Sequence, residues 1–500
     1  MRNEVRWRGS DMVRAFFLTL FMCIAVTFGL NTILQAQQPV KTGTKAFTES
    51  VILGEMIRQS IEADGTDTEI YKQLGGTRIL WSALVRGEID IYPDYTGTIT
   101  EEILADEDIR TTGELSAALN EYGIRMSEPL GFNNTYALGM KRSLARELGI
   151  QTISDLRDHP QLRFGFSNEF MDRNDGWPGL REAYNLSPAR VDGLEHALAY
   201  RGLDEGSIDV IDLYSTDPEI EYYDLLVLSD DRSFFPDYEA VILYRIEVHD
   251  LVVNTIERLE GAISSDEMSS LNAAVKLDGV PDAVAASEFL EETFQIESDV
   301  AVSSFRDRLA KNTADHLYLV LISLSLAIAI AIPMGILAVK INILEGAVLG
   351  TVGVMQTIPS LALLVFMIPL FGIGALPAMA ALFLYSLLPI VRNTHSGIKE
   401  IPLPILESAR ALGLPERVIL RRIEIPLALP SILAGIKTSA VINVGVATLG
   451  ALIGAGGYGQ PILTGIRLDN IQLILEGAVP AAVLALLVQG VFDLIEKKIT

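Results

Sequence analysis

Residues 407–430 read ESARALGLPERVILRRIEIPLALP, a charged and amphipathic stretch that lies between long apolar runs. Apolar runs of about 20 residues are long enough to cross a bilayer as helices. A charged stretch between two such runs is therefore expected to lie against one face of a membrane. Once the side of the membrane that this stretch faces is known, the sides of the other loops and of the soluble part follow.

Five apolar segments surround this stretch and predict five membrane-spanning segments: 317–339, 343–371, 375–391, 431–453 and 471–495. Pro359 and Pro369 interrupt the second of them. The loop after the third segment carries six basic residues, Arg392, Lys399, Arg410, Arg417, Arg421 and Arg422. Because basic loops stay in the cytoplasm, residue 311 is expected outside the cell and the C-terminus inside.

The N-terminal segment, residues 1–36, is expected to be a signal anchor. Arg2, Arg6, Arg8 and Arg14 precede an apolar run from Ala15 to Leu34, and this positive flank holds the N-terminus in the cytoplasm. A run of this length suits a membrane span better than the shorter core of a signal peptide. A cleaved signal peptide is the alternative, which leaves five spans instead of six.

Residues 37–300 are expected to form a soluble, extracytoplasmic module. Of the 64 acidic residues, 52 lie between residues 37 and 310, against 23 of the 39 basic residues. Such acidity argues against nucleic acid as a partner, because its phosphates would be repelled, and it suits a solvated surface or the attraction of cations. The single cysteine, Cys23, lies in the first apolar run, so the module contains no disulfide.

The module alternates apolar strands with helical patterns, which is typical of an α/β domain. The predicted strands cover 162–166, 208–213, 225–228 and 240–244. The predicted helices cover 50–61, 78–86, 193–201 and 250–260.

The charged loop itself predicts two helices. Residues 405–412 have a helical pattern that Gly413 and Pro415 terminate, and residues 416–423 form a second helix that ends at Pro426. On pattern alone, this loop is either an interfacial amphipathic segment without a partner or a docking element.

The spacing Glu407-Ser408-Ala409-x3-Gly413-x9-Ile423-x-Ile425-Pro426 resembles the EAA signature of binding-protein-dependent ABC importer permeases. Ser408 in place of alanine and isoleucine in place of leucine are departures from that signature. The resemblance implies an all-α transmembrane permease domain over residues 301–500, whose cytoplasmic loop 393–430 docks on an ATPase. The implied coupling residues are Glu407, Ala409, Gly413, Ile423 and Pro426.

The ATPase itself is expected on another chain. A phosphate-binding loop requires Gly-x4-Gly-Lys-[Ser/Thr], in which backbone N–H groups and the lysine bind the phosphates. No lysine of this sequence is preceded by that arrangement. We therefore expect no cofactor in this chain, with ATP bound by the partner subunit.

Eight short motifs follow one another in the soluble module: KAFTES (45–50), LGGT (74–77), GEID (87–90), DYTGT (94–98), NNTY (133–136), EFMDRNDG (169–176), YSTD (214–217) and FFPDY (234–238). Together they resemble the substrate-binding proteins for glycine betaine, choline and related osmoprotectants. This resemblance implies a two-lobed α/β clamp of the type II periplasmic-binding-protein class. The expected lobes are 42–133 with 237–300, and 134–236.

The resemblance also implies the ligand-binding residues. A quaternary ammonium group cannot donate a hydrogen bond, so ring faces hold it through cation–π attraction. The positions that match the aromatic box of the family are Tyr95, Tyr136, Tyr214 and Tyr238. Lys45, Thr98 and Arg173 match donors to a carboxylate, and Asn134 matches a polar neighbour of the cation. Any one tyrosine alone is more often an ordinary core residue.

The sequence therefore predicts a subunit of an osmoprotectant ABC importer, in which the binding protein is fused to its permease. Five core spans do not enclose a path, so we expect a homodimer with two ATPase subunits in the cell membrane. The five histidines share no metal-ligand spacing, and no nucleophile lies beside a base, so an enzyme is not expected. The alternatives are a membrane receptor for the same ligands and an importer of amino acids or another small solute.

Overall fold

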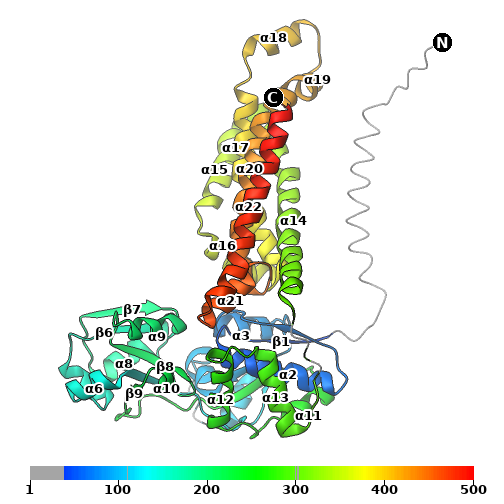
Figure 1. Cartoon of the computed structure of the whole chain (residues 1–500). Coiled ribbons are helices and arrows are strands. Elements are labelled where there is room, and N and C mark those ends of the chain that lie inside the picture. Colours follow the sequence, from blue (N-terminus) through cyan, green and yellow to red (C-terminus); the bar gives the residue numbers. More distant parts are fainter. Residues whose placement is uncertain (1–38, 108, 110, 299, 301–302, 500) are drawn as a thin grey trace.

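The computed structural model describes residues 39–107, 109, 111–298, 300 and 303–499. The predicted anchor at residues 1–36 lies outside these residues. The rest of the chain forms two parts, an α/β module and a long helical bundle that stands on it (Figure 1).

The first lobe of the module is built on a five-stranded sheet with the order β2-β1-β3-β10-β4. Its strands are β1 (Val40–Gly43), β2 (Thr68–Tyr71), β3 (Ile91–Tyr95), β4 (Ile124–Met126) and β10 (Ala240–Arg245). Strand β10 runs antiparallel to its neighbours β3 and β4, and every residue of β3 is buried. The main helices of this lobe are α2 (Thr48–Ala63), α3 (Thr77–Val85), α5 (Thr112–Glu121), α11 (Asp250–Glu257), α12 (Ser265–Lys276) and α13 (Asp282–Phe294).

The second lobe has its own five-stranded sheet with the order β7-β6-β8-β5-β9. Its strands are β5 (Tyr136–Lys141), β6 (Arg163–Ser167), β7 (Arg190–Leu194), β8 (Val210–Tyr214) and β9 (Leu225–Val227). Its helices include α6 (Arg142–Leu148), α7 (Asn168–Asp172), α8 (Trp177–Tyr184), α9 (His196–Asp204) and α10 (Glu219–Tyr222). The chain crosses between the lobes twice, from β4 to β5 and from β9 to β10, so the predicted two-lobed clamp is confirmed.

The predicted helix 193–201 is wrong at its beginning. Residues 190–194 form the edge strand β7, which pairs in parallel with β6. Helix α9 then begins at His196, because the Glu195 side chain caps it by accepting hydrogen bonds from the N–H groups of Ala197 and Leu198. The strand is set by pairing with a distant segment, which a local helical pattern does not reveal.

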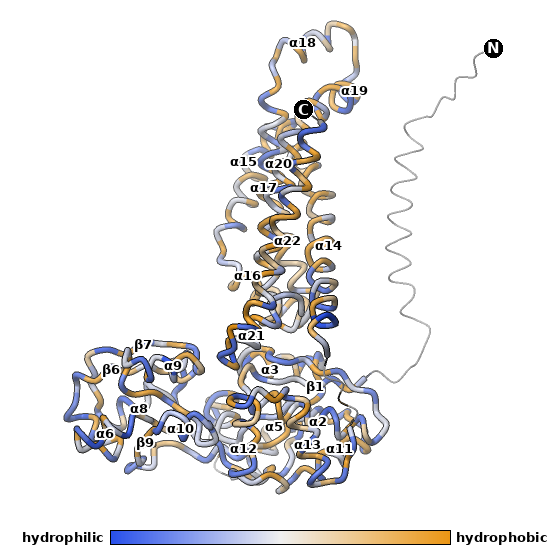
Figure 2. Tube along the Cα trace, viewed as in Figure 1, coloured by the Kyte–Doolittle hydropathy of each residue, from blue (hydrophilic) through white to orange (hydrophobic). Residues whose placement is uncertain are grey.

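Four helices of the bundle are long and apolar enough to cross a membrane. They are α14 (Phe305–Lys340), α17 (Ala375–Lys399), the continuous helical stretch Glu416–Ile453 that contains α20 (Ile425–Val446), and α22 (Ile471–Ile499). The helices α15 (Asn342–Thr357) and α16 (Ser360–Phe371) together make a fifth candidate that bends by 102° beside Pro359. Apolar residues follow these helices along their length (Figure 2), so the chain is a multi-pass membrane protein.

The charged loop lies at the end of the bundle opposite to the α/β module (Figure 1). It contains α18 (Leu403–Ala411) and α19 (Glu416–Ile419). Gly413 has a φ of 73°, and the N–H of Leu414 bonds the carbonyl of Ala409, so the predicted end of the first helix is confirmed.

The predicted end of the second helix at Pro426 is wrong. Helix α19 continues through a π-helical turn at Leu420–Glu424 into α20, and Pro426 lies in the first turn of α20. A proline ring in a regular helix meets the carbonyl four residues earlier. The wider π turn immediately before Pro426 makes room for that ring.

Candidate ligand site between the lobes

A cavity of about 580 Å³ lies in the cleft between the two lobes. The first lobe lines it with residues that include Lys45, Gly75 and Thr77, and the second lobe with residues that include Glu169 and Arg173. At its base is a much smaller recess of about 20 Å³. All eight predicted ligand residues line this recess, together with Phe47 and Glu169: Lys45, Tyr95, Thr98, Asn134, Tyr136, Arg173, Tyr214 and Tyr238.

Strand ends position the four tyrosines. Tyr136 begins β5 and lies directly opposite Tyr214, which ends β8. Tyr95 ends β3, and Tyr238 lies two residues before the start of β10. Tyr136 and Tyr238 lie at the two crossings between the lobes, Tyr95 belongs to the first lobe and Tyr214 to the second, so the rings meet at the junction of the lobes.

The rings contact one another in the structure. The Tyr136 ring centroid lies 5.2 Å from that of Tyr214 and 5.5 Å from that of Tyr238. Phe47 closes the group, with its centroid 5.6 Å from Tyr214 and 6.1 Å from Tyr95. A recess of this volume holds about one water molecule, so a trimethylammonium group enters it only when the rings move apart.

The two cationic side chains of the recess are already paired with carboxylates. Lys45 Nζ donates to Asp94 Oδ1 at 2.6 Å, and Arg173 Nη1 donates to Glu102 Oε2 at 2.8 Å. Arg173 also forms an ion pair with Asp175. The Arg173 guanidinium lies 5.6 Å from the Tyr136 ring centroid, so the chain's own cation faces one of the rings.

Glu49 lies behind the recess and connects both lobes. Its carboxylate accepts hydrogen bonds from Tyr95 Oη at 2.6 Å, Thr216 Oγ1 at 2.6 Å, Asn134 Nδ2 at 2.8 Å and Asn272 Nδ2 at 2.9 Å. Burial raises the pKa of Glu49, although these four hydrogen bonds act to lower it. Glu49 belongs to the motif 45–50, so the sequence offered a signal for it, but it was not among the predicted ligand residues.

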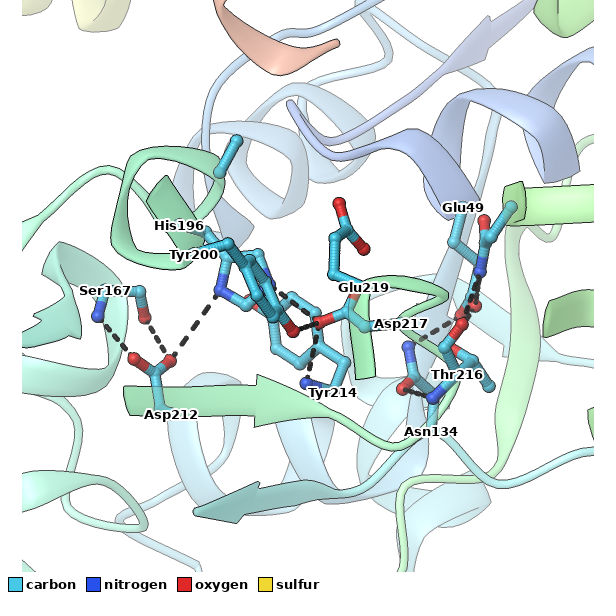
Figure 3. Close-up of polar contacts among 12 residues, drawn as sticks. Glu49, Asn134, Ser167, His196, Tyr200, Asp212, Tyr214, Thr216, Asp217 and Glu219 are labelled. Atoms are coloured by element: carbon cyan, nitrogen blue, oxygen red, sulfur yellow. Dashed lines mark hydrogen bonds and ion pairs between the residues drawn. The ribbon is translucent and has the colours of Figure 1, made fainter. Parts of the chain in front are cut away.

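A second polar cluster supports Tyr214 from outside the recess (Figure 3). The His196 ring stacks on Tyr214 at 4.4 Å between centroids, and its Nε2 lies 2.9 Å from Asp217 Oδ2. The same carboxylate accepts hydrogen bonds from Tyr200 Oη at 2.6 Å and from the N–H of Tyr214 at 2.9 Å. Burial alone lowers the pKa of His196, but Asp217 outweighs it and raises that pKa to about 9.

His196 is therefore an imidazolium at neutral pH, and it holds one ring of the site in position. The spacing of the histidines along the sequence gave no sign of this role for His196. Asp217 belongs to the motif 214–217, and helix α9 brings His196 to it.

The predicted coupling residues are not gathered in one cavity. Glu407 and Ala409 lie on α18, Gly413 follows it, Ile423 lies in the π turn and Pro426 in α20. Ala409 is buried, whereas Glu407 and Gly413 are exposed.

One contact of this loop was not predicted. Lys340 Nζ, at the end of α14, donates to Glu424 Oε1 at 2.7 Å. This ion pair joins the loop to the first helix of the bundle.

Comparison with known proteins agrees with this division into two parts. Residues 38–292 match the family model described as the substrate binding domain of ABC-type glycine betaine transport systems. Residues 327–500 match the inner membrane component of binding-protein-dependent transport systems. The chain is thus a transport subunit, in which a binding protein is fused to an ABC importer permease, and not an enzyme. It belongs to the family of ABC-type glycine betaine transport substrate-binding domains.

Curated relatives cover both parts of the chain. The glycine betaine/carnitine/choline transport system permease protein OpuCB of Bacillus subtilis is 45% identical over 192 residues, 38% of this chain and 88% of that protein. The carnitine transport binding protein OpuCC of Listeria monocytogenes is 31% identical over 274 residues, 52% of this chain and 89% of that protein. The ergothioneine transport permease/ergothioneine binding protein EgtU of Helicobacter pylori is 31% identical over 290 residues, 55% of this chain and 51% of that protein.

An importer of this kind works with an ATPase and a small-molecule solute. The match to transport permeases does not favour the receptor alternative, because a receptor has no need of a permease.

Proposed function

We propose that this chain captures a quaternary ammonium osmoprotectant, such as glycine betaine or choline, outside the cell and passes it through its own permease domain. The observation that carries the proposal is the meeting of four tyrosines and Phe47 from both lobes around one recess. The names of the relatives agree, because glycine betaine, carnitine, choline and ergothioneine all carry a trimethylammonium group.

The donors beside the rings suit either a zwitterion or a simple cation. Thr98 lines the recess, and Arg173 keeps N–H groups beyond those bonded to Asp175 and Glu102. A ligand carboxylate would bind there, as would a hydroxyl group. Titration of the full chain in nanodiscs with glycine betaine, choline and a neutral amino acid would identify the solute class. Tight binding of the amino acid alone would point to the second alternative, an importer of other small solutes.

Removing a ring from the recess provides the test of the site. Each good cation–π contact is worth about 0.5–2 kcal/mol, so Tyr214→Ala or Tyr238→Ala should weaken binding of the preferred solute by roughly twofold to 30-fold. Calorimetry on the full chain in nanodiscs measures this. Tyr222→Ala is the matched control, because Tyr222 is 65% exposed and does not line the recess. Unchanged affinity in both recess variants would contradict the assignment.

The proposed orientation places residues 37–310 outside the cell and the C-terminus in the cytoplasm. The separation of the α/β module from the arginine-rich loop by the length of the bundle supports it. Residues 1–36 then act as signal anchor or signal peptide, 37–300 as binding domain and 301–500 as permease domain.

In a Cys23→Ser background, a membrane-impermeant thiol reagent should label Ser143→Cys in intact cells and leave Ser408→Cys unlabelled.

The proposed assembly is a homodimer with two ATPase subunits, and ATP binds only to the ATPase. Large apolar side chains line the exposed surface of α22, among them Leu475, Leu486 and Leu494, and they suit lipid or a second permease. Leu403 and Leu412 of the cytoplasmic loop are 67% and 80% exposed, which suits a protein partner. Native mass spectrometry of the purified complex should give two copies of each subunit.

A further inference from the structure

One corner of the permease touches both lobes of the binding domain. Helix α21 (Gly459–Arg467) and the turn 468–470 join α20 to α22, and we call residues 467–470 the α21 corner. In Figure 1 this corner lies where the bundle meets the α/β module. Arg467 and Asp469, two residues apart, bond different lobes.

The contact with the first lobe is buried. Arg467 is 6% exposed, and its Nη1 and Nη2 donate to the two carboxylate oxygens of Asp282 at 2.9 Å each. Nη1 also donates to Thr48 Oγ1 at 3.1 Å, and Thr48 is the neighbour of Glu49 in the ligand site. Breaking such a pair leaves a buried charge without a partner, so this contact is expected to persist.

Further hydrogen bonds hold the same lobe. Gln73 Nε2 donates to Thr464 Oγ1 at 2.9 Å, and Arg86 Nη1 donates to the carbonyl of Ile368 at 3.2 Å. The first lobe is thus attached to the permease both at α21 and at the end of α16.

The contact with the second lobe is different in kind. Within the described residues, one hydrogen-bonded ion pair, Arg201–Asp469, joins the second lobe to the permease. Both side chains are 43% exposed. Exposed ion pairs are weak and sensitive to salt, so this contact is easily made and broken.

We infer that the permease holds the first lobe throughout transport and binds the second lobe only when the cleft is closed. The Cα atoms of Arg467 and Asp469 are at most about 7 Å apart, so both contacts require the lobes to be close. Opening at the two crossings would carry Arg201 on α9 away from Asp469. This inference rests on the importer architecture and not on the identity of the solute.

The lobes also bond each other beside this corner. Lys276 of the first lobe donates to Glu219 Oε2 at 2.7 Å and to Asp217 Oδ1 at 3.3 Å, both in the second lobe. The relative position of the two lobes that allows the Lys276 ion pairs between them therefore also allows the Arg201–Asp469 pair between the second lobe and the permease. By linkage, a solute that closes the lobes strengthens docking of the second lobe, and docking strengthens solute binding by the same factor.

Distances between spin labels test the inference in two steps. They are first compared between variants without solute, and then with glycine betaine or choline, which should narrow the distance distribution between the second lobe and the permease. In a Cys23→Ser background in nanodiscs, one label on the permease at Gln472→Cys is paired with Asn120→Cys on the first lobe or with Ser143→Cys on the second. Asp469→Asn should broaden the distribution of the 143–472 distance and leave the 120–472 distribution unchanged. The control is Asp204→Asn, which breaks a pair with Lys141 inside the second lobe and should change neither distribution.

Two further variants complete the experiment. Arg467→Gln should broaden both distributions, and the exchanged pair Arg201→Asp with Asp469→Arg should restore the narrow 143–472 distribution. An unchanged 143–472 distribution in Asp469→Asn, or equal broadening of both distances, would overturn the inference.

Titration of the same proteins separates this inference from the proposed function. Asp469→Asn should weaken the affinity of the full chain for glycine betaine or choline by about twofold to fivefold. Failure of both solutes to bind the unmodified chain would overturn the proposed function, and the distances measured without solute would still decide the docking.

Discussion

At the scale of single residues, His196 connects the ligand site to pH. Five titratable groups surround its ring: Asp217 at 2.9 Å, Asp212 at 3.9 Å, Lys276 on the far side of Asp217, the Tyr200 ring in edge contact and the Tyr214 ring stacked on it. The two carboxylates favour the imidazolium and Lys276 opposes it. Because the charged ring stacks on Tyr214, its protonation state affects both the stability and the shape of the recess.

Substituting His196 should remove a pH dependence of stability. The folded-state pKa of about 9 lies above the ordinary value of 6.5. The stabilisation is therefore complete below pH 6.5 and is lost as the pH rises through 9, an effect of up to about 3 kcal/mol. Thermal unfolding of the full chain, followed by near-UV circular dichroism at pH 6 and 9.5, should show this loss in the unmodified protein and not in His196→Gln. His159→Gln serves as the control, and an equal pH effect in all three proteins would refute the assignment.

The sequence located the recess but not its counter-charges. Motifs are local, so the positions of Lys45 and Arg173 could be predicted from their neighbours along the chain. Asp94 is 49 residues from Lys45 and Glu102 is 71 residues from Arg173, and only the folded lobes bring these pairs together. Asp175, the other partner of Arg173, lies in the same motif but was not predicted as its partner. From the sequence alone, both cations looked free to bind a ligand carboxylate.

At the scale of elements, the charged loop 393–430 depends on the sharp end of α18. Gly413 has a φ of 73°, a left-handed conformation that costs other residues roughly 1–2 kcal/mol. Gly413→Val combined with Glu407→Ala should therefore abolish stimulation of the ATPase by solute while leaving solute affinity unchanged. ATPase assays in proteoliposomes measure the coupling. Ser408→Ala, which changes the exposed neighbour to the residue usual in the signature, should keep full activity.

The ion pair between Lys340 and Glu424 should also affect coupling. Glu424 is 2% exposed in its side chain, and the pair joins the π turn to the end of α14. Glu424→Gln removes one charge and leaves Lys340 with the more distant carboxylate of Glu416, at 4.0 Å. We expect at least a fivefold lower solute-stimulated ATPase rate with unchanged solute affinity. Arg410→Gln, which breaks an exposed pair with Glu416, is the milder comparison. Equal rates in the two variants would contradict a special role for Glu424.

The π turn also explains one failure of prediction at this scale. Sequence patterns correctly gave the apolar segments and the end of α18, because these depend on composition and on Gly413. They placed a helix end at Pro426, since a proline usually interrupts a regular helix. A wider turn before the proline lets the helix continue, and whether that turn forms depends on the packing around Glu424. This packing cannot be predicted from the local sequence.

At the scale of the whole molecule, charge should govern how fast a solute arrives. The chain carries a net charge of −25, and the cleft is lined by five acidic residues, Glu101, Glu102, Glu169, Asp172 and Glu195. A field of this sign accelerates the association of cations, and salt screens it. Stopped-flow fluorescence should show the association rate of choline falling by about threefold or more between low and high salt, and that of zwitterionic glycine betaine changing far less. Equal salt dependence for the two solutes would show that the acidity serves solubility alone.

The connection between the two parts is short. Ten residues, 295–304, separate the end of α13 from the start of α14. Even fully extended, they span at most about 35 Å. The cell therefore makes one capturing domain for every permease copy and has no means of changing that ratio by expression. The binding domain of this chain stays attached to a permease domain, so more capture by this chain requires more copies of the whole transporter.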